Sequence, residues 1–169
     1  MEFVELGPQH EGHFVDFPCA RHRQPWTESS EYAIRHSLGW NLRAGTVKAL
    51  GVVSDTDLVG LIIWAPEDDD PACWQCIVLA VRSGHQGQGI GRQLKEKLLE
   101  RAQAQEIRLI NSLVHRDNLD MLKLNRALGA AVIPDPDDAA GEHFICTIEV
   151  QPKSKKARTR SPSRSIASK

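Results

Sequence analysis

Short apolar runs separated by turn residues dominate the first half of the chain. Such runs occupy residues 2–6, 47–53, 58–64 and 74–81, and their β-branched and aromatic content predicts four strands. The polar turn at residues 54–57 predicts that the second and third strands pair antiparallel. Apolar side chains with helical spacing over residues 9–17 and 27–38 predict two short helices between the first and second strands.

The period changes to that of a helix after residue 89. Ile90, Leu94, Leu98 and Ala102 recur every fourth residue, and Leu99 widens their stripe. Further runs predict a strand over residues 108–114, a helix over 118–128 that stops at Gly129, and strands over 130–133 and 143–150. The final strand could lie at the sheet edge. The strand–helix–strand unit predicts that strands 74–81 and 108–114 are parallel, so the fold class is α/β with a mixed sheet.

Three glycines alternate at the start of the long helix, in the hexapeptide Gln86–Gly91. A glycine turn between a strand and a helix directs backbone N–H groups at one point, which favours a phosphate. A Walker loop is excluded because Gly91 is followed by Arg92 and not by Lys. The dinucleotide fingerprint is excluded by its glycine spacing. The pattern Q/R-x-x-G-x-G/A is satisfied in full, and a purely structural glycine turn is the alternative.

This hexapeptide, with Leu79-Ala80-Val81 before it and an amphipathic helix after it, resembles the acyl-coenzyme A motif of the GCN5-related N-acetyltransferase (GNAT) family. The order of predicted strands and helices over residues 2–150 is similar to the whole fold of that family. The resemblance implies a central mixed, twisted sheet with helices on both faces and one acetyltransferase domain over residues 1–150. It further implies that the two parallel strands splay apart and that the pantetheine arm lies between them.

The resemblance assigns binding positions for acetyl-CoA. The backbone of residues 79–81 would hold the pantetheine arm and the acetyl group, and the amides of residues 86–91 would hold the pyrophosphate. Asn118 matches the asparagine of a second family motif and would bond the pantetheine amides, although a plain helix N-cap is the alternative. The implied positions are Leu79, Ala80, Val81, Gln86, Gly87, Gln88, Gly89, Ile90, Gly91, Arg92 and Asn118.

The chain departs from the family pattern at the positions that move protons. Asn125 occupies the place of the tyrosine that protonates the departing thiolate, and its amide could only donate a hydrogen bond. Tyr32, the chain's one tyrosine, is an alternative donor. Gln75 occupies the place of a catalytic glutamate, so His115 is the predicted substitute base. Glu67 and the acidic run 68–70 could act through water, and direct attack needs little base.

Charge is divided unevenly along the chain. Residues 151–169 carry seven basic and no acidic residues, which leaves residues 1–150 with a net charge of −8. The tail lacks the apolar content to order itself, so we expect it to be disordered. Weak, salt-sensitive contact with nucleic acid through this tail is a further hypothesis. The acidic run at 68–70 is either a solvated turn or an anionic rim that attracts cationic amines.

Cysteines and apolar segments limit the remaining classes. Cys73 and Cys76 have a CxxC spacing without a second pair, and they face opposite sides of a strand, so buried thiols are favoured over a metal site. No apolar run is long enough for a membrane span and no leader segment is visible, which predicts a cytoplasmic protein without membrane contact. A homodimer stays open.

The predicted function is therefore acetyl-CoA-dependent N-acetylation of a primary amine on a small molecule or peptide. The alternative is an acyl-CoA-binding sensor or partner domain with little turnover, which the departures at Gln75 and Asn125 favour. The sequence does not name the acceptor, because pocket-lining loops determine it.

Overall fold

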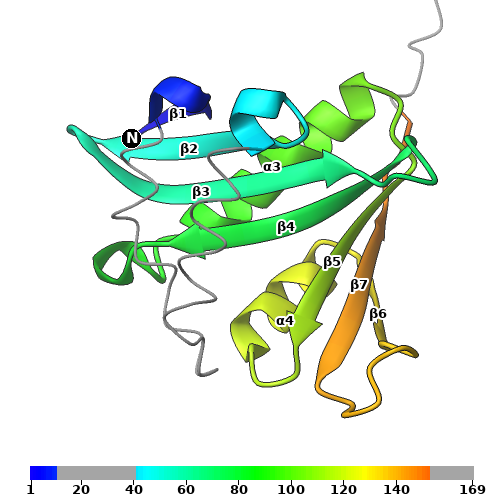
Figure 1. Cartoon of the computed structure of the whole chain (residues 1–169). Helices are drawn as coiled ribbons and strands as arrows, with labels where there is room; N and C mark the ends of the chain where they lie inside the picture. Colours follow the sequence, from blue (N-terminus) through cyan, green and yellow to red (C-terminus); the bar gives the residue numbers. More distant parts are fainter. Residues whose placement is uncertain (11–40, 153–169) are drawn as a thin grey trace, which may run out of the picture.

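The computed structural model describes residues 1–10 and 41–152, and within them seven strands form one sheet (Figure 1). The strands are β1 (Glu2–Leu6), β2 (Lys48–Ser54), β3 (Asp57–Pro66), β4 (Cys73–Val81), β5 (Leu109–His115), β6 (Ala131–Pro134) and β7 (His143–Glu149). Their order across the sheet is β1-β2-β3-β4-β5-β7-β6. Among the described strands, β4 and β5 are the one parallel pair, as the sequence predicted.

One prediction about the order of the sheet is wrong. The last strand, β7, does not lie at the sheet edge, because it pairs with β5 on one side and with β6 on the other. The short β6 is the edge strand, a length typical of protected edges. Residues 41–44 are helical, a short segment that the sequence did not predict.

Two α-helices follow the glycine turn and the parallel crossover. Helix α3 (Ile90–Ala104) begins where the four-residue apolar period begins, and α4 (Leu119–Ala127) follows β5. Gly129 has a φ of 84°, which permits the left-handed stop that the sequence predicted after α4. Two short 3-10 helices are η1 (Pro8–His10) and η2 (Ser83–His85). No described helix has the length and apolarity that a membrane crossing requires.

Several predicted features lie outside the described residues. They are the helix over residues 27–38, most of the helix over 9–17, Tyr32, Cys19 and the basic tail from residue 153. The tail's predicted disorder and its nucleic-acid contact therefore stay predictions.

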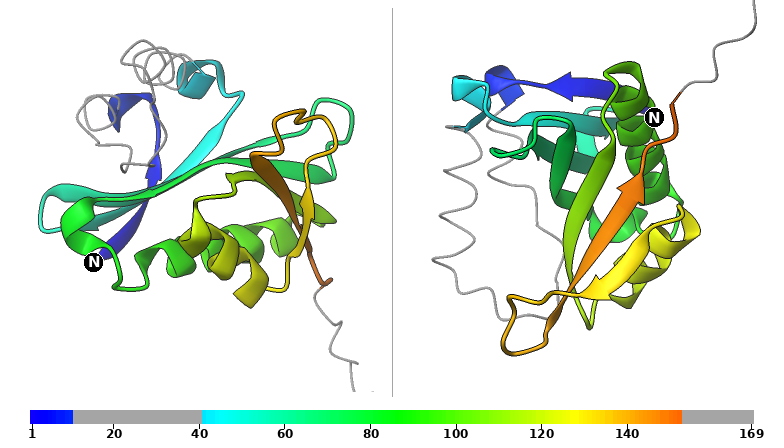
Figure 2. Two further views of the ribbon diagram at one scale, coloured as in Figure 1. Left: turned by 90° about the horizontal axis from the view of Figure 1, so that it is seen from below. Right: turned by 90° about the vertical axis from the view of Figure 1, so that its right-hand side faces the viewer.

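The sheet buries apolar side chains on both faces. One core joins α3 to the sheet, and its fully buried members include Leu94, Leu98 and Ile110. The opposite face packs Leu42, from the helical residues 41–44, with Leu61 and Ile63 of β3. Helix α3 therefore packs on one face of the β1–β4 half, and the helical turn at residues 41–44 packs on the other, as Figure 2 shows from below. Gly60 of β3 lets α3 approach closely, because an added Cβ would lie 2.8 Å from the Cγ2 of Ile90.

In the other half of the sheet, formed by β5, β7 and β6, a described helix covers only one face. Leu122 of α4 packs with Val114 of β5 and Cys146 of β7. Because side chains alternate along a strand, the neighbouring residues of β5 and β7 project from the other face. We call this second surface the open face; it carries Asn111, Leu113 and His115 of β5 and His143, Ile145 and Thr147 of β7.

The parallel strands β4 and β5 part after a short contact. They pair only from Cys73 opposite Leu109 to Gln75 opposite Asn111, and Figure 1 shows them diverging beyond that point. At the same level β4 contains a bulge, because Cys76 pairs with Trp64 and Val78 pairs with Ile63, which leaves Ile77 without a partner on β3. The result is a V-shaped gap between β4 and β5 that opens toward their carboxyl ends.

Candidate functional site

The glycine loop leads from β4 into the start of α3. Gly87 and Gly89 have φ angles of 77° and 79°, a backbone region that side chains with a Cβ rarely adopt. Gly89 is the N-cap of α3 and has no side chain to bond the first helical amides. The loop residues 86–89 are exposed. These amides and the positive end of the helix dipole therefore suit a phosphate group.

Side chains on both sides of the loop fix its shape. The Nε2 of Gln86 donates a 3.0 Å hydrogen bond to the carbonyl oxygen of Val81, which ties the loop to the end of β4. The Nε of Arg82 donates to the carbonyl oxygen of Leu58 at 3.0 Å. The backbone N–H of Arg82 donates to the carbonyl oxygen of Val59 at 2.8 Å. Arg92 is held by Glu96 at 2.8 Å, one turn along α3. The side chain at the first motif position, Gln86, thus helps to fix the shape of the loop.

The predicted pantetheine edge of β4 borders the V-shaped gap. Residues 78–81 pair with β3 on one side, and in the described structure they have no strand partner on the other. Leu79 and Val81 pack against the core beneath α3, while Ala80 belongs to the core on the opposite face. An extended arm that enters this gap would meet backbone N–H and C=O groups left without a ladder partner.

Asn118 and Asn125 occupy different environments on α4. Asn118 is the N-cap, and its Oδ1 accepts a 3.2 Å hydrogen bond from the N–H of Met121. Asn125 is 0% exposed and donates from Nδ2 to the Met121 carbonyl oxygen at 3.0 Å. Its Oδ1 is buried without a hydrogen-bond partner among the described residues. Asn125 therefore lies inside the protein and does not open onto the gap in this structure.

His115 ends β5 among acidic side chains. Its Nδ1 accepts a 3.2 Å hydrogen bond from the N–H of Asp117, and its Nε2 lies 3.9 Å from Oε2 of Glu142. The neutral ring then carries its proton on Nε2, and its lone pair on Nδ1 is already engaged. His115 can accept a proton only after the bond from Asp117 opens.

A second histidine that the sequence did not single out lies beside His115. His143 pairs with His115 across β5 and β7, and their rings make an edge-to-face contact with centroids 5.3 Å apart. Asp138 lies 2.9 Å from the Nδ1 of His143, and its carboxylate accepts the backbone N–H groups of Glu142 and His143 at 2.7 Å each. These contacts, the one with His143 foremost, lower the pKa of Asp138 to about 2. An Asp138-oriented ring presents Nε2 as an acceptor.

At the vertex of the gap, Asn111 organises a polar network on the open face. Its Nδ2 donates to Oε1 of Glu67 at 2.8 Å and lies 3.3 Å from the sulfur of Cys73, while its Oδ1 accepts from Thr147 at 2.8 Å. Burial, reinforced by Glu67, raises the pKa of the Cys73 thiol to about 12, so this thiol stays protonated. Cys76 packs on the α3 side, so the two cysteines face opposite sides of β4.

The acidic loop after β3 is tied to the start of β5, away from the open end of the gap. Asp70 forms a 2.7 Å ion pair with Arg108 and accepts a 3.0 Å hydrogen bond from the N–H of Ala72. Of the predicted acidic residues, Glu67 is the one that contacts the vertex of the gap, because it accepts a hydrogen bond from Asn111. Across the described ranges, no three His, Cys, Asp or Glu side chains gather in an arrangement that could hold a metal ion.

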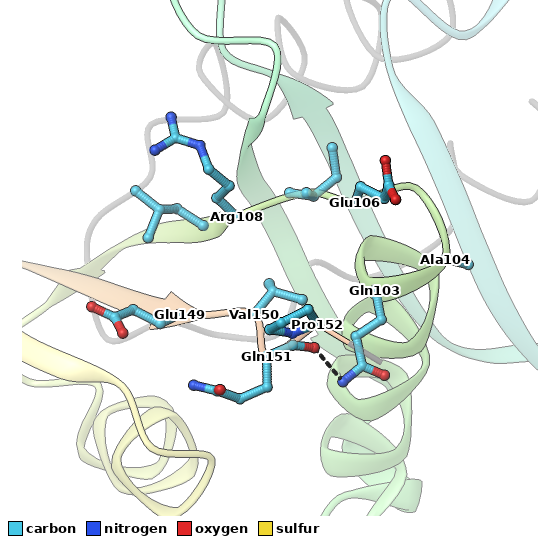
Figure 3. A pocket seen from close by; sticks show the side chains of 10 residues that line it. Gln103, Ala104, Glu106, Arg108, Glu149, Val150, Gln151 and Pro152 are labelled. Carbon is cyan, nitrogen blue, oxygen red and sulfur yellow. Dashed lines mark hydrogen bonds between the residues drawn. The ribbon is translucent and has the colours of Figure 1, made fainter. Parts of the chain in front are cut away.

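A pocket of about 800 Å³ lies at the opposite end of β5 from His115 (Figure 3). The carboxyl end of α3 and the end of β7 line it, and Gln103 crosses it with a 2.9 Å hydrogen bond to the carbonyl oxygen of Gln151. It contains none of the predicted site residues, which lie along the gap and the glycine loop.

Comparison with known proteins agrees with this geometry. The chain is similar to an acetyltransferase of the GNAT family from Desulfovibrio desulfuricans, with a TM-score of 0.72 and 18% identity over 89% of this chain and 99% of that one. It is also similar to the PaiA N-acetyltransferase from Thermoplasma acidophilum in complex with coenzyme A (0.67, 15%, 88% and 99%). A third similar structure is the ribosomal-protein-S18-alanine N-acetyltransferase from Escherichia coli (0.69, 15%, 92% and 97%).

The structural likenesses show the fold, and the sequence itself shows the family. No curated protein matches the chain. The profile described as "Acetyltransferase (GNAT) family" matches residues 13–130, which is more than half of the sequence and includes the glycine loop, the V-shaped gap and α4. The chain therefore belongs to the GNAT family of acetyltransferases.

Proposed function

We propose that the protein is an N-acetyltransferase that moves an acetyl group from acetyl-CoA to a primary amine of a small molecule or peptide. The observation that carries the proposal is the β4 edge beyond Gln75, which β5 leaves unpaired and which runs directly into the glycine loop. One continuous path thus offers backbone partners for an amide-containing arm and then an anion site for a pyrophosphate. The PaiA N-acetyltransferase, solved with coenzyme A, supports this use of the fold.

In the proposed reaction the amine nitrogen attacks the thioester carbonyl carbon and forms a C–N bond. Backbone N–H groups of β4 near the bulge at Ile77 would stabilise the charge on the carbonyl oxygen. The C–S bond then breaks and CoA leaves as a thiolate, which takes a proton from solvent, while the proton released by the amine passes to a side chain beside the gap. Holding both reactants in the gap supplies most of the acceleration.

Proton transfer is assigned to the open face beside the gap. His115 is the proposed proton acceptor, after its Nδ1 releases the N–H of Asp117. His143, oriented by Asp138, lies one strand further away and offers a ring nitrogen that this bond does not occupy. Asn125, the proposed hydrogen-bond donor to the thiolate, is buried, so it reaches the thiolate only after α4 shifts. Tyr32, the other proposed donor, lies outside the described residues.

The second candidate function is a domain that binds acyl-CoA with little turnover. The buried Asn125 in the tyrosine position and the engaged Nδ1 of His115 favour it. Thiol release from acetyl-CoA, measured with a panel of amines, separates the two functions. Amine-dependent release by the wild type and none by Gly89→Asp supports the transferase. Binding of acetyl-CoA without release for any amine supports the binding domain.

A further inference from the structure

Three apolar side chains form a row across the open face. Ile133 of β6 pairs with Ile145 of β7, and Ile145 pairs with Leu113 of β5, so the three side chains lie next to one another on the same face. Ile133 is 54% exposed, Leu113 is 51% exposed, and Ile145 is half-buried. Burying the row would stabilise any apolar group placed on it, since water covers it now.

The row begins at the gap between β4 and β5. Leu113 lies two residues beyond Asn111, the last residue of β5 that pairs with β4. On the facing strand, Ile77 of the bulge is 47% exposed. Three of the large hydrophobic side chains that are exposed in the described structure therefore lie beside the gap or on the row, namely Ile77, Leu113 and Ile133. A ligand that reacts in the gap can therefore extend across β5 and β7 toward β6.

Acidic groups lie beside the row and give it a charge preference. The loop over residues 135–142 joins β6 to β7 on one side of the row and contains four acidic and no basic residues. On the row's other side, Asn111 holds the carboxylate of Glu67 at 2.8 Å. The basic residue that follows His115 at the end of β5 is Arg116. This arrangement attracts a cationic head joined to an apolar body and disfavours an anionic one.

We infer that the acceptor is a primary amine with an extended apolar substituent, which lies on the row formed by Leu113, Ile145 and Ile133. The inference rests on the proposed function and names its acceptor class. From β5 to β6 the row spans two strand spacings, roughly 10 Å, so it accommodates an alkyl chain of medium length. A polyamine would place further ammonium groups on apolar side chains and is the poorer acceptor.

The test uses the full-length protein, acetyl-CoA and straight-chain amines from propylamine to octylamine, with spermidine for comparison. We expect kcat/KM to rise roughly two- to fourfold per methylene, the range set by partial to full burial of a CH₂ group. Ile133→Ser should reduce the ratio of kcat/KM for octylamine to that for propylamine severalfold. Ile133→Leu, which keeps the apolar area, should retain the wild-type ratio.

The outcomes separate this inference from the proposed function. Absence of transfer to every amine would defeat the proposed function itself. Transfer with no dependence on chain length, or a preference for spermidine, would overturn the inference alone. Sedimentation of wild type and Ile133→Ser adds a second criterion. A dimer that this substitution dissociates, with the amine profile unchanged, would show that the row binds a second copy of the chain and would also overturn the inference.

Discussion

Lys95 of α3 donates a 2.6 Å hydrogen bond from Nζ to the Oγ of Ser112 on β5. Lys95 is 0% exposed, and among the described residues it forms no ion pair with a carboxylate. Ser112 follows Asn111, so the bond joins α3 to β5 one residue beyond the last pair of the parallel strands. The buried amine of Lys95, bonded to a hydroxyl, therefore lies at the vertex of the gap on the side that α3 covers.

This pair predicts a non-additive effect on stability. Ser112→Ala should lower the free energy of unfolding by about 1–3 kcal/mol, because it leaves a buried amine without its acceptor. The double variant Lys95→Met with Ser112→Ala should be at least as stable as the Ser112→Ala single variant, since an apolar side chain of similar length needs no partner. Urea denaturation of both variants tests the claim. A double variant that is less stable than Ser112→Ala would contradict it.

The two helix-proximal glycines should respond differently to alanine. Gly89 has a φ of 79°, so Gly89→Ala should cost about 1–2 kcal/mol through backbone strain. An added Cβ at Gly91 would meet Val81 and Leu79 side chains at 3.8 and 3.9 Å, which is ordinary contact. Gly91→Ala should therefore keep or raise the melting temperature by improving helix propensity. Equal losses at the two positions would show that the loop geometry is not as described.

Replacing the two open-face histidines should identify the proton acceptor. If His115 takes the proton, His115→Gln should lower kcat and remove an ionisation near neutrality from the pH profile of kcat/KM. If the pair of His143 and Asp138 takes it, His143→Gln should have this effect and His115→Gln should leave the ionisation in place. A profile unchanged in both variants would show that direct attack proceeds without either ring.

Asp138 should make stability depend on pH in the acid range. Its pKa falls from 3.8 to about 2 on folding, so its contribution is complete above pH 3.8 and is lost as the pH falls toward 2. Asp138→Asn should therefore lower the melting temperature at pH 7, and the difference from wild type should vanish near pH 2. Asp137→Asn, in the same loop, is the matched control and should match wild type throughout. A difference for Asp138→Asn that persists at pH 2 would refute the electrostatic explanation.

The sequence predicted most of the fold because its periods are local. The change from a strand to a four-residue helical period at Ile90, and the stop at Gly129, placed α3 and α4 nearly to the residue. The position of β7 inside the sheet was missed, because pairing with both β5 and β6 is a long-range choice that no local period encodes. The contact between His115 and His143 depends on the same long-range pairing of β5 with β7.

The candidate site was predictable where backbone carries it and not where side chains meet across strands. The alternating glycines predicted a backbone turn before the long helix, and Gly87 and Gly89 adopt positive φ angles there. The bulge at Ile77 and the apolar row of the open face depend on register, and register follows from the whole sheet. The burial of Asn125 was equally invisible, since it depends on how α4 packs on β5 and β7.

Calorimetric titration with acetyl-CoA tests the central claim, that the β4 edge and the glycine loop bind this donor. We compare wild type, Gly89→Ala and Gly89→Asp, because both variants add a Cβ at the left-handed N-cap position and only the aspartate adds a negative charge at the start of α3. The account predicts binding by wild type, retained binding by Gly89→Ala and loss of binding by Gly89→Asp in protein that stays folded. Failure of the wild type to bind acetyl-CoA, or equal binding by both variants, would contradict it.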